Sequence, residues 1–133
     1  VFVKASPPYN FDLSGQIFVN GDPQVRRFEK GTFRQVIRIG DKLAQVSVES
    51  VGTVEKPRLS IGLKTNCKLT EADKENAAKT VSHIFNLSFD LTSFCKEAEN
   101  DKTMQFLSRK LYGLKSPMTQ FAFEALVDSI VEQ

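Results

Sequence analysis

A chain of 133 residues that is 41% hydrophobic and 26% charged, with a net charge of +2, has the composition of one ordinary globular domain, with room for the beginning of a second. No stretch approaches the roughly 18 apolar residues that cross a bilayer, and no signal peptide is visible, so we expect a cytoplasmic protein without a membrane partner. One histidine and two isolated cysteines, Cys67 and Cys95, argue against a disulfide framework and a zinc site, and we expect no metal and no cofactor.

The first half of the chain predicts an antiparallel sheet, because apolar and polar residues alternate with the period of strands that have one wet face. This alternation runs through residues 33–39, 44–49 and 59–64. Glycine-containing turns at 29–33 and 39–43 join neighbouring strands, and the second has the Gly-Asp dipeptide of a tight hairpin. Residues 16–20 and 24–29 are expected to add one or two more strands. Residues 1–64 also hold ten Lys/Arg against six Asp/Glu, a net charge of +4, which permits contact with phosphates without requiring it.

The apolar pattern changes to a helical one in the second half. Thr70 is the expected N-cap of a helix, and Asp73 three residues later gives a partial capping box. Apolar residues at helical spacing would lay this helix across the dry face of the sheet: Ala77, Val81, Ile84 and Phe85. Two shorter helices are expected within residues 89–100 and 101–113. The prediction is an α+β fold, an antiparallel sheet with helices packed on one side.

A last helix is expected to begin with Ser116 as its N-cap and Pro117 at its first position. Its apolar stripe consists of Phe123, Leu126, Val127, Ile130 and Val131. An apolar side chain left exposed forfeits about 1.5–3 kcal/mol relative to burial, so an open stripe marks a missing partner surface. A further domain explains such a stripe better than a dimer does. Without that domain, we expect the helix to associate with another copy.

The residues themselves supply little catalytic chemistry. His83 lies alone in a predicted helix, and neither a nucleophile elbow nor a phosphate-binding glycine loop occurs. Ser14-Gly15-Gln16 is a polar interruption before the apolar residues 17–19. It is either a turn that leads into the first strand, with Phe18 in the core, or a place where the backbone approaches a ligand beside a residue that has no side chain.

Five stretches, taken together in their order and spacing, carry a resemblance that none of them carries alone. They are PPYNFDL (7–13), FEKGTFRQVIRIGDKLAQVSVES (28–50), LSIGL (59–63), VSHIFNLSFDL (81–91) and FAFEALVDSIVEQ (121–133). In these stretches the chain resembles the N-terminal part of the helix-hairpin-helix DNA glycosylases. The likeness is nearest to the AlkA-type 3-methyladenine glycosylases, and there is a second likeness to the 8-oxoguanine glycosylases. The two point to different lesions, so the damaged purine, alkylated or 8-oxoguanine, stays open.

The resemblance implies a fold similar to half of a TATA-binding protein for residues 1–100, and the first helices of the catalytic helical domain for residues 101–133. It also implies that the hairpin motif and the catalytic aspartate lie beyond Gln133. The full-length enzyme is then expected to flip a damaged purine from duplex DNA and cleave its N-glycosidic bond, and this chain alone is expected to be inactive. The implied partner is double-stranded DNA with a damaged base, which places the protein at the nucleoid. A freestanding domain that binds nucleic acid or protein is the alternative.

The resemblance also implies site residues. Ser14-Gly15-Gln16-x-Phe18 is similar to the turn with which 8-oxoguanine glycosylases present a glycine carbonyl to the N7–H of the lesion, and guanine lacks that donor because its N7 is an acceptor. Gly15, Gln16 and Phe18 are therefore expected to line the substrate pocket, and Phe121 is a candidate to stack on the base. Gln133 falls just before the wedge position of the family and is expected to contact DNA. No residue of the chain matches the catalytic aspartate.

Overall fold

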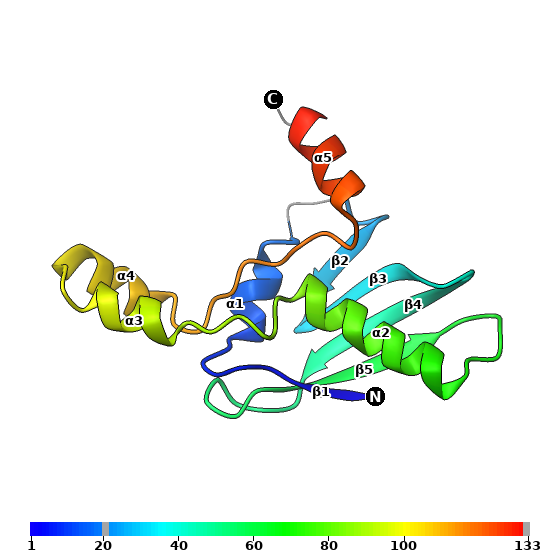
Figure 1. The fold of residues 1–133 in the computed structure, drawn as a ribbon, viewed down its shortest axis with the longest axis horizontal. Helices are drawn as coiled ribbons and strands as arrows, with labels where there is room; N and C mark the ends of the chain where they lie inside the picture. The colour runs from blue at the N-terminus through cyan, green and yellow to red at the C-terminus, as the bar shows by residue number, and fades with distance from the viewer. Residues whose placement is uncertain (20–21, 132–133) are drawn as a thin grey trace.

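The structure is a computed structural model that describes residues 1–19 and 22–131, and it has the α+β arrangement expected from the sequence (Figure 1). Its elements in chain order are β1 (Phe2–Lys4), α1 (Phe11–Gln16), β2 (Arg26–Glu29), β3 (Thr32–Ile39), β4 (Lys42–Ser50), β5 (Arg58–Lys64), α2 (Glu71–Ile84), α3 (Thr92–Ala98), α4 (Lys102–Lys110) and α5 (Ala122–Val131). Within these residues the strands form one antiparallel sheet of five strands, in the order β1-β5-β4-β3-β2.

Strands β2, β3 and β4 are joined by the two hairpins that the sequence predicted. Lys30 and Gly31 have φ values of 51° and 73°, the left-handed conformation that the two central residues of a type I′ turn require. In the second turn Gly40 has a φ of 62°. The resulting register places Phe33 opposite Val48, so that the apolar residues of β3 and β4 point to the same face of the sheet.

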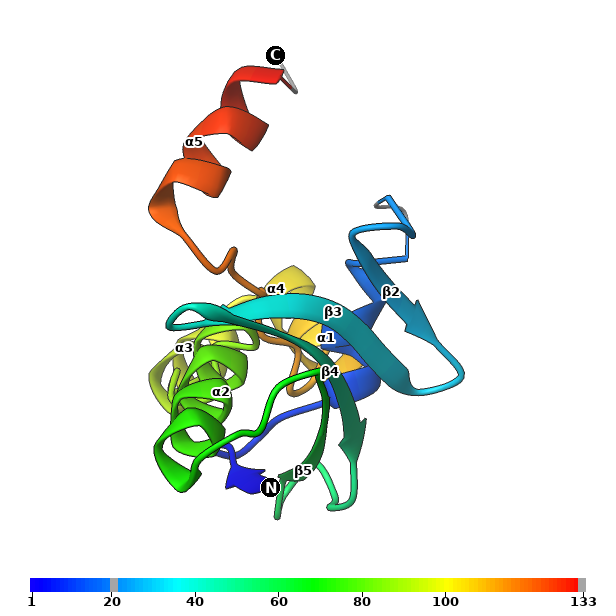
Figure 2. The same ribbon diagram turned by 90° about the vertical axis from the view of Figure 1, so that its right-hand side faces the viewer.

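That apolar face is covered by α1 and α2 and holds a core of aromatic rings. Phe85, directly after α2, is fully buried, and its ring centroid lies 5.1 Å from that of Phe11, 5.9 Å from that of Phe18 and 4.9 Å from that of Phe33. Tilted and edge-to-face pairs of this kind add stability beyond the area that they bury. Figure 2 shows α2 on one side of the sheet, and no helix of the described residues packs on the opposite side.

The predicted helix after Thr70 is confirmed as α2. The Thr70 hydroxyl oxygen accepts a hydrogen bond from the Asp73 backbone N–H (3.2 Å), and an Asp73 carboxylate oxygen accepts one from the Thr70 backbone N–H (2.8 Å), so the capping box is complete. Ala77, Val81 and Ile84 are buried against the sheet, as the helical spacing predicted. The two shorter helices are confirmed as α3 and α4.

Of the two segments expected to add one or two strands, residues 24–29 contain β2, whereas residue 16 ends the short helix α1 and residues 17–19 form a turn. Asn10 caps α1 by accepting a hydrogen bond from the Leu13 backbone N–H through its side-chain oxygen (3.0 Å). Phe11 and Gly15, one helical turn apart, are buried on the side of α1 that faces the sheet. Local propensity disfavours a helix that contains Ser and Gly, so this packing stabilises it. Strand β1, only three residues long, was not predicted.

The last helix begins at Ala122, five residues later than the sequence predicted. The Met118 backbone N–H donates a hydrogen bond to the Ile84 carbonyl oxygen (2.7 Å), which ties the preceding segment to the end of α2. The Ser116 hydroxyl donates only a 3.5 Å bond to the Pro117 carbonyl oxygen and does not cap the helix. Tertiary contacts therefore hold residues 114–119 outside the helix despite a favourable N-terminal sequence.

Candidate functional site

Helix α1 lies against β2 so closely that only glycine fits at residue 15. A Cβ atom added to Gly15 would lie 2.6 Å from Cδ2 of Phe28, and real side chains do not approach so near. The carbonyl oxygen of Gly15 accepts a hydrogen bond from the Phe18 backbone N–H at 3.0 Å. The missing side chain therefore makes room for the Phe28 ring, and the carbonyl oxygen also accepts from the backbone N–H of Ile17, which ends the helix.

A buried lysine ties the segment before α5 to α1 and to the N-terminal residues. Lys115 is 1% exposed, and its Nζ donates hydrogen bonds to the carbonyl oxygens of Ser6 (2.7 Å) and Leu87 (3.2 Å) and lies 5.5 Å from the centroid of the Tyr9 ring. Its backbone N–H donates to Oγ of Ser14 in α1 (3.1 Å). Burial lowers the pKa of Lys115 and raises that of the Tyr9 hydroxyl. Lys115 thus fixes α1 relative to the segment that leads into α5.

Gly113 brings the same two segments together through the backbone. Its carbonyl oxygen accepts a hydrogen bond from the Asn10 backbone N–H (2.7 Å). Its φ is 81°, and a Cβ there would lie 2.8 Å from the Asn10 nitrogen, so both the conformation and the close approach require glycine.

Arg26 of β2 connects the end of α1 with α5. Its guanidinium carbon lies 5.6 Å from the centroid of the Phe18 ring, and its Nη2 lies 3.0 Å from Oε1 of Glu124 in the first turn of α5. Both side chains of this ion pair are mostly shielded from solvent, with 20% and 28% of their surface exposed. The pair holds the start of α5 at the β2 edge of the sheet.

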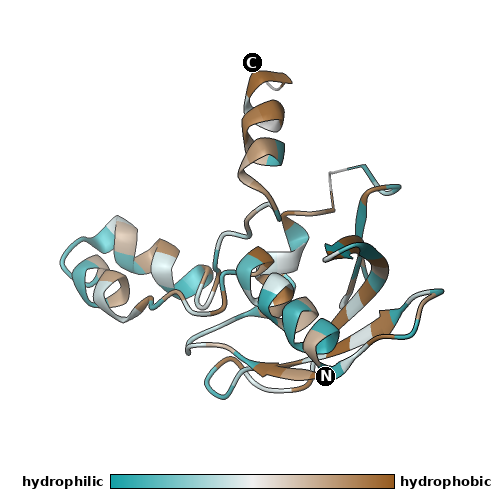
Figure 3. Cartoon of the chain, turned by 45° about the vertical axis from the view of Figure 1, so that its right-hand side comes forward, coloured by the Kyte–Doolittle hydropathy of each residue, from teal (hydrophilic) through white to brown (hydrophobic). Residues whose placement is uncertain are grey.

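Beyond this ion pair, the apolar side chains of α5 are exposed to solvent. Figure 3 shows its ribbon as predominantly hydrophobic from one end to the other, in contrast to the mixed colours of α2. Five of its large apolar side chains are exposed by the fractions that follow: Phe123 76%, Leu126 58%, Val127 39%, Ile130 64% and Val131 78%. No described residue covers this stripe, which the sequence led us to expect to be open in this chain.

The family model of the 8-oxoguanine DNA glycosylase N-terminal domain matches residues 7–126. The chain belongs to this family. Its fold is similar to that of a 3-methyladenine DNA-glycosylase from Archaeoglobus fulgidus, with a TM-score of 0.81 at 15% sequence identity. The alignment covers 100% of this chain and 44% of that protein, so the chain spans less than half the length of this structural relative. No curated protein matches the sequence.

The structure brings together only some of the predicted site residues of this 8-oxoguanine glycosylase N-terminal domain. Gly15 and Gln16 lie at the end of α1, Gly15 buried and Gln16 exposed, while Phe18 is 6% exposed and belongs to the aromatic core. Phe121 is 52% exposed and, with Arg38, Gly40, Lys79, His83 and Gln120 among its neighbours, lines a separate hollow of about 390 Å³. Gln133 lies outside the described residues.

Sequence reasoning missed Lys115 and Arg26 because both look like surface cations in the sequence. For Lys115, the one hint in the sequence is Gly113, which indicates a close approach of two backbone segments. Nothing in the sequence identifies the carbonyl groups to which Lys115 donates its hydrogen bonds. The partner of Arg26, Glu124, is 98 residues away. Such long-range pairs leave no periodic pattern.

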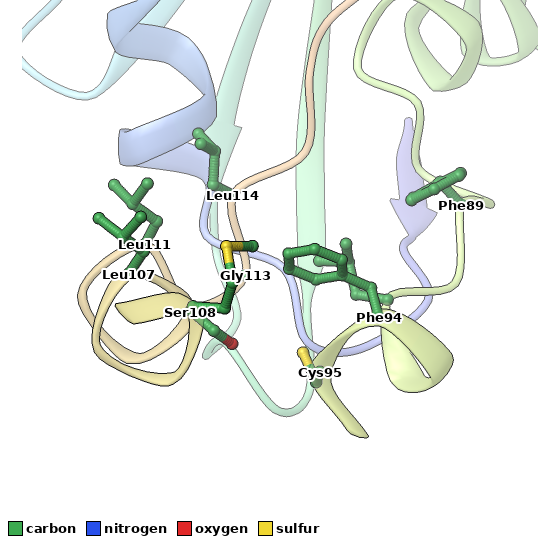
Figure 4. Close-up of a pocket in the computed structure, with 10 residues that line it drawn as sticks. Phe89, Phe94, Cys95, Leu107, Ser108, Leu111, Gly113 and Leu114 are labelled. Carbon is green, nitrogen blue, oxygen red and sulfur yellow. The ribbon is translucent and has the colours of Figure 1, made fainter. Parts of the chain in front are cut away.

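A second apolar hollow of the domain lies beside α3 and α4 (Figure 4). It has a volume of about 390 Å³. Phe94 and Cys95 of α3 point into it, as do Leu107 of α4 and Leu111, the residue after α4.

Across residues 1–19 and 22–131, no group of three His, Cys, Asp or Glu side chains could hold a metal ion. No helix in the same residues is long and apolar enough to cross a membrane.

Proposed function

We propose that this domain is the N-terminal part of a base-excision DNA glycosylase that flips a damaged purine out of duplex DNA and cleaves its N-glycosidic bond. The observation that carries the proposal is the family match over residues 7–126. The relative of similar fold is a 3-methyladenine DNA-glycosylase more than twice as long as this chain, which leaves room for a catalytic part beyond residue 133. The catalytic hairpin and its aspartate belong to that part.

Residues 1–100 form the N-terminal α+β domain in this proposal, and residues 101–133 begin the helical domain. The exposed stripe of α5 supports this division, because at about 1.5–3 kcal/mol for each large apolar side chain it would gain most of its stability from a covering partner. Contacts of α5 with the sheet domain are few and polar, such as the pair Arg26–Glu124. Further helices of the same protein cover the stripe.

The wall of the base pocket on this side is the end of α1. In this proposal the carbonyl group of Gly15 faces the base, and the exposed Gln16 lies next to it. An acceptor in that position favours 8-oxoguanine over guanine, because N7 of the lesion is a donor and N7 of guanine is an acceptor. Phe18 supports this wall from the core and does not stack on the base itself. In this proposal Phe121 stacks on the flipped base and Gln133 contacts the DNA.

The test is an excision assay with the full-length protein on duplexes that contain 8-oxoguanine, 3-methyladenine or no lesion. We expect base release from at least one lesion duplex and none from the undamaged one, and we expect the 133-residue chain alone to release no base. A full-length protein that binds duplex DNA but releases neither base would contradict the proposal and favour a freestanding nucleic-acid-binding domain.

The identity of the lesion follows from the same assay. If the Gly15 carbonyl accepts a hydrogen bond from N7–H, 8-oxoguanine should be excised faster than 3-methyladenine. The reverse order would mean that the end of α1 only shapes the pocket wall and does not recognise the lesion. Either base must be unstacked and unpaired before it is cleaved, at a cost of a few kcal/mol that is common to both and largely cancels in the comparison.

A further inference from the structure

The face of the sheet that points away from α2 is open (Figure 2), and the side chains that the strands place on it are mostly cationic. Along β3, residues 33, 35, 37 and 39 are buried, whereas residues 34, 36 and 38 are exposed, and the same alternation continues on the neighbouring strands. The exposed cations of this face are Lys4, Arg27, Arg34, Arg38, Arg58 and Lys64. Two carboxylates, Glu29 and Glu49, share the face, which leaves it with a net charge of +4.

Two pairs of these cations stand directly opposite each other on neighbouring strands. The register pairs Arg27 with Arg34 and Lys4 with Arg58. Like charges in such positions destabilise a sheet. These pairs therefore do not serve the stability of the fold. An external anion bound between the cations would reduce their repulsion.

Ion pairs neutralise cations on the covered face but hardly on the open one. On the covered face Nζ of Lys42 lies 2.7 Å from Oδ2 of Asp73. On the open face, within the part of the chain that the structure describes, the ion pair present is Arg27–Glu29 at 3.7 Å, with more than half of each side chain exposed. The remaining five cations are available to a ligand.

The floor between the cations holds small residues on β4 and β5, the exposed aliphatic side chains of Val36 and Leu43, and one aromatic ring. Ser47 and Gly62 face each other across β4 and β5, and a Cβ on Gly62 would lie 2.5 Å from Oγ of Ser47. The aromatic ring on this face, Phe2, is 57% exposed, and the guanidinium carbon of Arg58 lies 4.3 Å from its centroid. One ring that already packs against a cation does not make the series of stacking platforms found in single-strand binders, so charge and hydrogen bonds hold the ligand.

Size and chemistry fit the phosphate backbone of a duplex. Five strands at about 4.8 Å spacing extend over about 19 Å, and duplex DNA presents on the order of ten phosphate charges over that length. Four of the six cations are arginines, whose planar guanidinium groups match phosphate oxygens in pairs. We propose that the open face of the sheet binds the phosphate backbone of duplex DNA without reading base sequence or lesion. It is a second DNA contact, separate from the end of α1, and it rests on the proposed function only in taking DNA as the polyanion.

The test measures binding of the full-length protein to a lesion-free duplex over a range of salt concentrations. Arg34→Gln combined with Lys64→Gln removes two cations from opposite sides of the floor. Each phosphate contact contributes about 0.9 to the slope of log K against log salt, so we expect the slope to shrink by about 1.8 and Kd at ~0.1 M salt to rise roughly ten- to sixtyfold. The matched control, Lys96→Gln with Lys102→Gln on α3 and α4, removes the same charge from exposed positions elsewhere. Equal effects of the two pairs of substitutions on DNA binding would overturn the proposal. No effect of the first pair would also overturn it, and would favour an acidic protein as the partner of this face.

A second variant separates binding from folding. Gln45→Glu places a carboxylate opposite Lys64 on the neighbouring strand, so we expect unchanged or higher thermal stability together with weaker DNA binding. Unchanged binding by Gln45→Glu would also count against the surface. Excision at saturating DNA is expected to be unaffected by all these substitutions, since none of them touches α1. Absence of excision activity would contradict the proposed function. The binding test would still be valid, because it measures DNA affinity and not excision.

Discussion

The sheet domain and helix α5 are both rich in apolar side chains, yet they differ completely in what covers them. Phe33 and Val46 are 0% exposed under α1 and α2, whereas Phe123 and Ile130 on α5 are 76% and 64% exposed. In both regions the periodicity of the sequence identifies the apolar face. The difference teaches that periodicity predicts which face of a helix or strand is apolar, but it does not say which partner buries that face.

The largest expected effect separates these two regions directly. Phe33→Ala removes a fully buried ring and should lower the free energy of unfolding of the 133-residue chain by about 3–5 kcal/mol. Phe123→Ala removes the same atoms from an exposed position and should change it by no more than about 0.5 kcal/mol. Urea unfolding of both variants gives the comparison. A comparable cost for Phe123→Ala would mean that α5 is covered within this chain after all.

Lys115 tests the connection between the two regions. Lys115→Met keeps most of the aliphatic stem but removes the ammonium donor of the Ser6 carbonyl, whereas the Leu87 carbonyl keeps the backbone N–H of Ser6 as a donor, and we expect a loss of about 1–3 kcal/mol in stability. Urea unfolding measures it, and Lys110→Met, an exposed lysine at the end of α4, is the control. A neutral result for Lys115→Met would show that its bonds do not fasten the segment before α5.

The same variant has a pH signature. Burial lowers the pKa of Lys115 below its usual 10.5, so just below pH 10.5 the unfolded chain holds a proton that the folded chain has released. The stability of the wild type therefore rises with pH in that window, and this part of the rise is absent in Lys115→Met. The difference between the two unfolding free energies, measured at increasing pH up to 10.5, should follow that sign. A difference independent of pH would contradict the burial of the charge.

Gly15 tests whether α1 belongs to the sheet domain alone or also to a pocket shared with the helical part. In Gly15→Ala the new methyl group meets the Phe28 ring, and such overpacking should cost about 1–3 kcal/mol in stability. The displaced carbonyl should in addition weaken a hydrogen bond to 8-oxoguanine worth about 0.5–1.5 kcal/mol, a two- to tenfold loss of excision that 3-methyladenine does not share. Excision of both lesions by the full-length variant, at a temperature where its melting curve shows it folded, decides between the two roles. An equal loss on both substrates would restrict Gly15 to packing.

Self-association is the expected behaviour of the bare helix in the chain by itself. At high concentration the 133-residue chain should form oligomers through α5, and Ile130→Asp should shift it toward monomer because a charge on the stripe opposes burial. Phe106→Asp on α4, where the side chain is equally exposed at 64%, is the control. Sedimentation that finds a monomer for the wild type would contradict this expectation.

The smallest expected effect concerns the capping box at the rim of the sheet domain. Hydrogen bonds from Lys42 and Thr70 lower the pKa of Asp73 from 3.8 to about 2. Between these values the unfolded chain binds more protons, so the stabilising contribution of Asp73 is complete above pH 3.8 and is lost as the pH falls through about 2. Melting temperatures of the wild type and Asp73→Asn should converge in acid and separate above pH 3.8. Curves that stay parallel over that range would contradict the prediction.

Much of the fold could be predicted because its signals are local. The hairpin at Gly40 and the capping box of Thr70 and Asp73 are specified by residues a few positions apart, and both are confirmed. Helix α1 could not be predicted, since six residues that include Ser14 and Gly15 form a helix only against Phe28 and the segment at Lys115. The start of α5 was misplaced for the same reason, because the Met118–Ile84 bond overrides a good capping sequence.

The candidate site was predictable only in part, and the limit has a physical cause. A motif named Gly15 and Gln16 as candidates, but the groups packed around α1 come from distant strands and loops. Arg26 finds Glu124 and Lys115 finds Ser6 across nearly the whole chain, and no spacing rule connects them. Phe18 was assigned to the pocket from its position in the motif, whereas its burial is set by Phe33 and Phe85.

The bond between Lys115 and Ser6 joins residues 109 positions apart, which bears on how the protein is made. On the ribosome Ser6 emerges well before Lys115, which is added only after about a hundred further residues. At typical translation rates of about 5–20 residues per second, this delay is on the order of ten seconds. During that time the hairpins of β2, β3 and β4, whose contacts are local, can form, and β1 can pair with β5. The segment between β1 and α1 receives its bond from Lys115 only after the sheet is complete.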